Sequence, residues 1–123
     1  GSAPARGMGT MKRGDVYDAL FDPVEGSEAA GRRPAVIVSR DAFNRSSPVV
    51  IVVPCTSYHE GRTIYPSQVL LRAGHAGLSG DSVVQGEQIR AIAKSRLDRR
   101  RGSLSEAALV AVSAALVRVL DLA

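Results

Sequence analysis

The sequence predicts a single small domain that is mainly β, with a strongly curved sheet or barrel and one α-helix at its C-terminal end. Several short apolar runs rich in β-branched residues are separated by segments that contain glycine and proline. One segment near the end of the chain carries apolar residues at helical spacing. The 123 residues show no internal repeat and no domain boundary, which fits one domain with a modest core.

Five strands are expected, near residues 15–21, 34–39, 49–54, 67–71 and 82–92. In the first of them, Tyr17, Ala19 and Phe21 alternate with their neighbours, as in a strand with one buried face. Pro34 lacks an amide donor and therefore suits the first residue of the second strand. Gly86 is expected to form a bulge in the last strand. Loops are expected at 59–63 and at 73–80, where three glycines occur.

Two helical segments are expected. A short helical turn over 41–45 would be capped by Asp41 or Ser39. The longer helix covers 106–121, where apolar residues recur at positions 109, 112, 116 and 119–120. Ser105 is a suitable N-cap for this helix, and Leu104 with Leu109 fits the hydrophobic staple across it.

Charge and cysteine content narrow the class of protein. Sixteen basic and 12 acidic residues give a formal net charge of +4. This charge favours a polyanionic partner, and the alternative explanation is that it only keeps the protein soluble. The single cysteine, Cys55, excludes an internal disulfide framework and a cysteine-based zinc site. No apolar stretch approaches the roughly 20 residues of a membrane span. These features together lead us to expect a cytoplasmic protein with no membrane association.

Two segments carry the polar groups that are best suited to ligand binding or catalysis. The loop 26–34 holds two glycines, Glu28 and two arginines, and it ends where an apolar strand begins, which should hold Arg33 in place. A guanidinium can bind a phosphate group with two parallel hydrogen bonds. The second segment follows the buried run 49–53 and delivers the hydroxyls of Thr56 and Ser57 to a strand end.

These segments belong to a series of motifs that resembles the MazF/PemK family of toxin endoribonucleases. The motifs are Arg-Gly-Asp-Val-Tyr at 13–17, Gly-Ser-Glu-x-x-Gly-x-Arg-Pro at 26–34, Val-Pro-Cys-Thr-Ser at 53–57 and Glu-Gln-Ile-Arg at 87–90. Further matches are Lys-Ser-Arg-Leu at 94–97 and Gly-Ser-Leu-Ser at 102–105. Each motif alone is weak, but their order and spacing extend from residue 13 to about residue 122.

The resemblance implies an SH3-like barrel of the MazF/CcdB toxin type, formed by residues 11–123 as one toxin endoribonuclease domain. Residues 1–10, rich in Gly, Ala and Pro, are interpreted as an expression remnant or a disordered leader. The implied function is sequence-specific cleavage of single-stranded mRNA to 2′,3′-cyclic phosphate and 5′-hydroxyl ends, with no metal ion or other cofactor. The implied partners are a second copy, forming a homodimer, and a MazE-like antitoxin.

The resemblance also implies the catalytic residues. Arg33 matches a catalytic arginine and would stabilise the transition state, whereas otherwise it would be a structural ion-pairing residue. Thr56 would donate its hydroxyl to the scissile phosphate, whereas otherwise it would be an ordinary β-branched strand residue. Glu28 is a candidate for the general base or for a residue that positions the loop. A solvated glutamate titrates near 4.3, too low for an efficient base at neutral pH, and burial could raise it.

Four residues are candidates for substrate binding. Ser27 and Ser57 would contact RNA through hydroxyl or amide groups. Gln88 and Arg90 are two positions apart on an expected strand and would share one face, either for base and phosphate contacts or as a polar outer surface.

Other features leave alternatives open. The basic run Arg96 to Arg101 is either a solvated surface or a phosphate track. The two histidines, His59 and His75, match no functional position and are expected at the surface. Many family members carry tryptophan at the position of Asp18, so this strand departs from the family pattern. The rival functions are a gyrase-poisoning toxin of the CcdB kind and a non-catalytic nucleic-acid-binding module on the same barrel.

Overall fold

The computed structural model describes residues 11–22 and 31–122. The elements in chain order are β1 (Asp15–Phe21), β2 (Gly31–Ile37), α2 (Asp41–Ser46), β3 (Val49–Ser57), β4 (Gln68–Leu71), η1 (His75–Gly77), β5 (Ser82–Gln85), η2 (Gly86–Gln88), β6 (Arg90–Ala93), η3 (Lys94–Arg96), β7 (Leu97–Ser103) and α3 (Glu106–Leu120). The η elements are single 3-10 turns. In these described ranges, no helix is long and apolar enough to cross a membrane.

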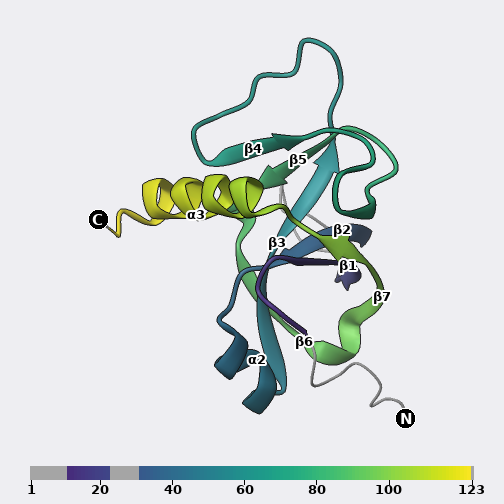
Figure 1. Cartoon of the computed structure of the whole chain (residues 1–123), viewed down its shortest axis with the longest axis vertical. Helices are drawn as coiled ribbons and strands as arrows, with labels where there is room; N and C mark the ends of the chain where they lie inside the picture. Colours follow the sequence, from purple (N-terminus) through teal and green to yellow (C-terminus); the bar gives the residue numbers. More distant parts are fainter. Residues whose placement is uncertain (1–10, 23–30, 123) are drawn as a thin grey trace.

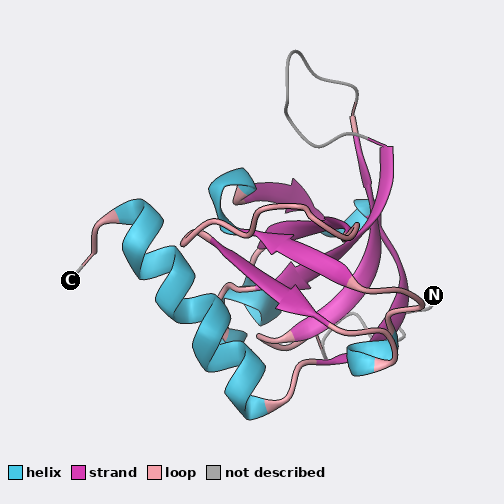
Figure 2. Cartoon of the chain, turned by 90° about the horizontal axis from the view of Figure 1, so that it is seen from above, coloured by secondary structure: helices cyan, strands magenta, loops and turns pink. Residues whose placement is uncertain are grey.

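The strands form one antiparallel sheet in the order β4-β5-β3-β2-β1-β7, with β6 also pairing with β3. The sheet is strongly curved, and α3 runs along one side of it (Figures 1 and 2). The expected mainly β fold with a C-terminal helix is therefore confirmed, and the curvature is consistent with the SH3-like barrel. Residues 1–10, interpreted above as a leader, lie outside the described residues.

The core has two parts, because successive residues of the central strands point to opposite sides of the sheet. One cluster joins the sheet to α3, and its members include Val16, Val36, Val53, Val112 and Leu116. The other lies on the opposite side and includes Tyr17, Phe21, Ile37, Val52 and Ile92. The central strands are thus buried on both faces, which fixes their register.

The strands that flank the two polar segments are longer than expected. β2 begins at Gly31, so Arg33 lies within the strand and Pro34 is internal to it. Pro34 is tolerated there because pairing of β2 with β3 begins only at the next residue, Ala35. β3 continues through Pro54 to Ser57, because it exchanges β6 for β5 as its partner around that proline. Thr56 is therefore a strand residue rather than a residue of a loop.

The expected single strand at 82–92 is wrong. The chain forms β5 and β6 with the 3-10 turn η2 between them, and Gly86 begins that turn instead of forming a bulge. The physical reason is a close approach: a Cβ on Gly86 would lie 2.4 Å from the carbonyl oxygen of Ser67. β7 was not predicted, because its sequence is dominated by arginine and lacks apolar alternation.

The two helices differ in how well their ends were predicted. Ser105 is the N-cap of α3, and its hydroxyl accepts a hydrogen bond from the Ala108 amide at 3.1 Å, as expected. The helical turn α2 is present, but neither expected cap residue caps it. Asp41 instead accepts a hydrogen bond from the Arg13 amide at 2.8 Å, and Ser39 accepts one from the Ile51 amide at 3.0 Å.

Candidate functional site

A polar cleft of about 280 Å³ lies where β2 and β3 leave the centre of the sheet. One wall consists of residues 32–34 of β2 and 55–57 of β3, and the facing wall is the loop segment 78–82. Arg101 reaches the cleft from β7. The cleft therefore gathers side chains from segments that lie far apart in the sequence.

Arg33 and Thr56 meet in this cleft. The antiparallel register pairs Ala35 with Pro54, and continuing it by two residues places Arg33 opposite Thr56 on the same face. Arg33 Nη1 donates a hydrogen bond to Thr56 Oγ1 at 3.3 Å. Both residues are half-buried, so each keeps a surface turned to solvent. The cleft thus presents a cation and a hydroxyl to a ligand, and Ser57 adds a second hydroxyl at its edge.

Cys55 precedes Thr56 on β3, is buried and borders the cleft. Burial raises the pKa of its thiol to about 12, although the Arg101 guanidinium acts in the opposite direction. The thiol therefore stays protonated near neutral pH and is not a nucleophile. Cys55 is thus a small side chain packed in the core.

Asp81 shapes the facing wall. Its carboxylate accepts hydrogen bonds from the Ala73 amide at 2.8 Å and from Arg72 Nη1 at 3.1 Å. The Ala73 amide, followed by Arg72, lowers the pKa of this carboxyl below its ordinary value. The carboxylate closes the loop that begins at residue 72, and at neutral pH it is an anion engaged in these contacts.

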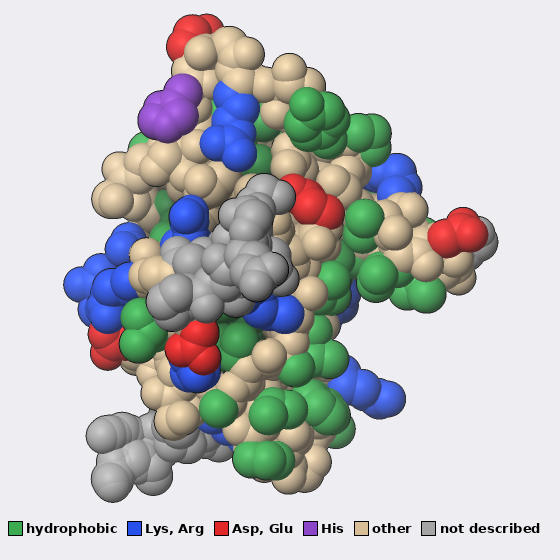
Figure 3. Space-filling view, turned by 180° about the vertical axis from the view of Figure 1, so that it is seen from behind, with side chains coloured by type: hydrophobic (Ala, Val, Ile, Leu, Met, Phe, Trp, Pro, Cys, Tyr) green, Lys and Arg blue, Asp and Glu red, His purple; other side chains and the backbone are tan. Residues whose placement is uncertain are grey.

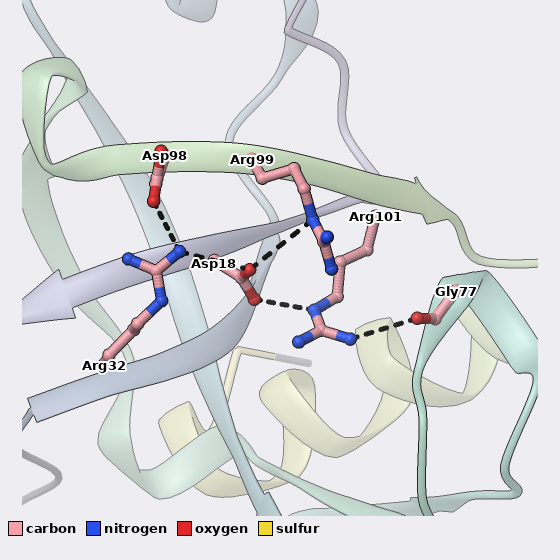
Figure 4. A network of polar contacts seen from close by, with 6 residues as sticks. All are labelled: Asp18, Arg32, Gly77, Asp98, Arg99 and Arg101. Atoms are coloured by element: carbon pink, nitrogen blue, oxygen red, sulfur yellow. Dashed lines mark hydrogen bonds and ion pairs between the residues drawn. The ribbon is translucent and has the colours of Figure 1, made fainter.

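Behind the cleft lies a network of ion pairs centred on Asp18 (Figure 4). Its side chain is only 6% exposed, and it accepts a hydrogen bond from Arg101 Nε at 2.6 Å. The guanidiniums of Arg32 and Arg99 lie 3.6 Å and 3.8 Å away. Arg32 also donates a hydrogen bond to Asp98. Asp18 therefore links β1 to both neighbouring strands through charged contacts.

The structure separates Gln88 and Arg90 from the cleft. Gln88 belongs to η2 rather than to a strand, so the expectation that the two share one strand face is wrong. Arg90 begins β6, and its guanidinium lies 4.7 Å from the centroid of the Phe21 ring. Neither side chain lines the cleft. Glu28 and Ser27 lie outside the described residues.

The arginines of the basic run lie among carboxylates in the structure. Figure 3 shows Lys and Arg side chains spread over one face with Asp and Glu side chains among them. Each of the four arginines contacts a carboxylate. The pairs are Arg96 with Asp22, Arg99 and Arg101 with Asp18, and Arg100 with Asp15.

The two histidines do not share a site. His59 is exposed, as expected. His75 is half-buried and has a structural contact, because its Nε2 accepts a hydrogen bond from the Ser105 amide at 3.2 Å. Among the described residues, no group of three His, Cys, Asp or Glu side chains is arranged to hold a metal ion.

Sequence reasoning missed Arg101, Asp81 and Asp18 as residues of the cleft or its support. A usable signal existed for Asp18, because an acidic residue in the middle of a largely apolar first strand indicates a buried ion pair. The identity of its partner depends on the pairing of β1 with β7, which the sequence pattern did not reveal.

Comparisons with known proteins agree with this geometry. The family described as "PemK-like, MazF-like toxin of type II toxin-antitoxin system" matches residues 12–120. A curated relative, endoribonuclease MazF9 of Mycobacterium tuberculosis, is 44% identical over 117 residues, covering 91% of this chain and 98% of that protein.

Solved structures show the same fold. The crystal structure of MazF from Deinococcus radiodurans superposes with a TM-score of 0.75 at 31% identity, covering 90% of this chain and 96% of that one. An endoribonuclease in complex with its cognate antitoxin, from a mycobacterial species, gives 0.73 at 27% identity, covering 92% and 97%. The cleft, the fold and these similarities lead to one conclusion: the chain belongs to the PemK/MazF family of toxins of type II toxin–antitoxin systems.

Proposed function

We propose that this protein is the toxin of a type II toxin–antitoxin pair and that it cleaves single-stranded mRNA at specific sequences without a metal ion. The observation that carries the proposal is the pair Arg33 and Thr56, joined at 3.3 Å in an open polar cleft. The naming of the curated relative as an endoribonuclease supports it.

The reaction needs little more than such a cleft, because RNA supplies its own nucleophile. The 2′-hydroxyl loses its proton to a base, and its oxygen forms a bond to the adjacent phosphorus. The bond from phosphorus to the 5′-oxygen breaks, and that oxygen takes up a proton. The products are a 2′,3′-cyclic phosphate and a 5′-hydroxyl, with no covalent enzyme intermediate.

Arg33 has the properties needed for the charged transition state. A guanidinium stays protonated at any physiological pH, so it is suited to stabilising charge rather than to moving protons. Thr56 would hold a second phosphate oxygen by donating its hydroxyl. By analogy with a lost oxyanion donor, removing either contact should cost about 3–4 kcal/mol of transition-state stabilisation.

The reaction also needs a general base that removes the proton of the 2′-hydroxyl. Cys55 and Asp81 are poor candidates, since burial keeps the first protonated and existing hydrogen bonds engage the second. Glu28, from the loop that leads into β2, is the candidate that we propose for the base or for positioning of that loop. Ser27 would contact substrate from the same loop.

The recognised RNA sequence would be selected by loops around the cleft. The segments 59–65 and 73–80 flank β4 and β5, and the second leads into the cleft wall at 78–82. Unpaired bases can be held there by hydrogen bonds to their edges. Ser57 lies on the same rim and would bind the RNA backbone, whereas Gln88 and Arg90 would act only on RNA that extends beyond the cleft.

We also propose that the protein forms a homodimer and is neutralised by a MazE-like antitoxin. The mycobacterial neighbour, solved with its cognate antitoxin, supports this expectation. An acidic segment that orders on binding would place carboxylates against Arg33 and exclude the phosphate of the RNA.

The test is cleavage of a long single-stranded RNA by purified protein in the presence of EDTA. Three variants address the site: Arg33→Ala, Arg33→Lys and Thr56→Val, which preserves the β-branched shape. A matched control, Arg45→Ala, removes an exposed arginine from α2 at the other end of β3 (Figure 1). Each variant is first checked for a cooperative thermal transition.

We expect wild type and Arg45→Ala to make the same discrete cuts with cyclic-phosphate ends. Arg33→Ala and Thr56→Val should be slower by at least a hundredfold. Arg33→Lys should recover only part of the loss, because lysine cannot make the bidentate contact. A folded wild-type protein that leaves RNA intact would refute the proposal. That result would instead favour a gyrase-poisoning toxin of the CcdB kind.

A further inference from the structure

Arg101 is a second guanidinium at the cleft, and it comes from β7 rather than from the strands that carry Arg33 and Thr56. Its side chain is 18% exposed. Nε donates a hydrogen bond to Asp18 Oδ1 at 2.6 Å, and Nη1 donates one to the Gly77 carbonyl at 3.1 Å. In Figure 4 the third nitrogen points away from Gly77. The side chain is therefore held by two of its nitrogens while it contributes to the cleft surface.

The charges around Arg101 do not cancel. The network of Figure 4 contains the guanidiniums of Arg32, Arg99 and Arg101 and the carboxylates of Asp18 and Asp98. Three positive and two negative charges leave this group with a net charge of +1. Arg32 and Arg101 both line the cleft, whereas Arg99 does not and is 68% exposed. The cleft lining itself holds three guanidiniums, those of Arg32, Arg33 and Arg101, and one carboxylate, that of Asp81, so the charge of the lining is positive.

We propose that Arg101 binds a phosphate of the RNA adjacent to the scissile one, and that Asp18 is the positioning residue that holds it there. The inference rests on the proposed function and adds a substrate contact to it. A buried carboxylate that binds Nε fixes the plane of the guanidinium, so less side-chain freedom is lost when a phosphate binds. The Gly77 contact fixes the same plane from the loop that forms the facing wall.

A purely structural role for Arg101 predicts different behaviour. A buried ion pair can be replaced by a neutral pair of similar shape with little change in stability. If the pair only joined β1, β7 and the loop, such a replacement would leave RNA binding unchanged. If Arg101 neutralises a phosphate, the replacement would weaken binding and reduce its dependence on salt.

The experiment measures binding of a single-stranded oligoribonucleotide that carries the site cut by wild type, with a 2′-deoxy substitution at the cleaved nucleotide. Affinity is measured for wild type, Arg101→Gln and Arg99→Gln over a range of salt concentrations. Arg99→Gln is the matched control, since it removes the same charge from the same strand and also contacts Asp18 but does not line the cleft.

We expect Arg101→Gln to weaken binding about tenfold or more, as for a lost charge-assisted hydrogen bond. Its log–log salt slope should fall by about 0.7, the contribution of one phosphate on a single strand. Arg99→Gln should retain the wild-type slope. Asp18→Asn should raise the KM of cleavage with little change in kcat, and it should have no further effect in the Arg101→Gln background.

The double variant Asp18→Asn/Arg101→Gln covers the case in which Arg101→Gln does not fold, because an amide pair keeps a hydrogen bond without charge. A folded variant lacking Arg101 that keeps the wild-type salt slope and affinity overturns the inference. If wild type cuts RNA and Arg33→Ala does not, that result leaves the proposed function intact. If wild type neither cuts nor binds RNA, the proposed function and this inference fail together.

Discussion

Replacing Gly77 with alanine is expected to destabilise the protein far more than the same change at Gly74. Both glycines have positive φ, +75° and +92°, and both lie in the loop that ends at the cleft wall. Alanine in this backbone region costs about 1–2 kcal/mol at either position. A Cβ at Gly74 meets no atom within 4 Å, so no further cost arises there. Gly74→Ala is therefore the control for backbone conformation.

At Gly77 the added Cβ would lie 2.2 Å from the carbonyl oxygen of Arg101, where real contacts are not shorter than 3.0 Å. The loop and β7 would have to separate by the difference, 0.8 Å. A shift of that size along the hydrogen bond from Arg101 Nη1 to the Gly77 carbonyl would lengthen it from 3.1 Å to 3.9 Å and break it. A hydrogen bond to a charged group contributes about 1.5–3 kcal/mol.

The expected loss in the free energy of unfolding is therefore about 2.5–5 kcal/mol for Gly77→Ala and about 1–2 kcal/mol for Gly74→Ala. Urea denaturation followed by circular dichroism measures both, and equal m-values would show that the same transition is compared. Equal losses for the two variants, within about 0.5 kcal/mol, would refute the close approach of the loop to β7.

Three further predictions concern other parts of the fold. Ser105→Ala removes the N-cap bond of α3 and should lower the free energy of unfolding by about 1 kcal/mol in urea, with Ser105→Asp close to wild type. Cys55, with its pKa raised to about 12 by burial, should resist iodoacetamide at pH 8 in the folded protein and react fully in urea. The lowered pKa of Asp81 means that its contact stabilises the loop fully above the ordinary value of 3.8 and is lost as pH falls through the lower folded-state value. As pH falls through that range, the protection of the amides of residues 72–81 against hydrogen exchange should decrease. The variant Asp81→Asn should not show this pH-dependent loss of protection.

The parts of the fold that the sequence predicted well are those set by local pattern. The first strand was predicted over its observed range, and the C-terminal helix ends at Leu120, one residue before the expected end. Ser105 caps that helix as expected because capping depends on a residue and the amide three positions later. Such features need no knowledge of the rest of the chain.

The parts that failed depend on partners distant in sequence. Pro34 and Pro54 look like strand ends, yet both are internal. β2 gains β3 as a second partner just after Pro34, and β3 exchanges β6 for β5 around Pro54. The sequence alone gives no indication of where such an exchange occurs. The prediction of a bulge at Gly86 failed for a similar reason. Glycine is needed there because the backbone of Ser67 lies close to it, and its neighbours in the chain do not show that contact.

The candidate site shows the same division. The motifs indicated Arg33 and Thr56 correctly as residues that meet, and the register explains why they meet: equal offsets from the pair Ala35 and Pro54 place them opposite each other. Gln88 and Arg90 were grouped by spacing alone, and a 3-10 turn separated them. Residue spacing predicts a shared face only where the element type is certain.

The arginines clustered at residues 96–101 do not by themselves identify the surface that binds RNA. Residues 96–101 contain four arginines, and all four contact carboxylates from β1 or the residue that follows it. Pairing of β7 with β1 brings these groups together, so much of this charge is neutralised within the protein. What distinguishes Arg101 is its place at the cleft and the two contacts that fix its orientation. A cation that is held in place and faces a ligand contributes more to recognition than several exposed ones, because exposed pairs are screened by salt and lose side-chain freedom on binding.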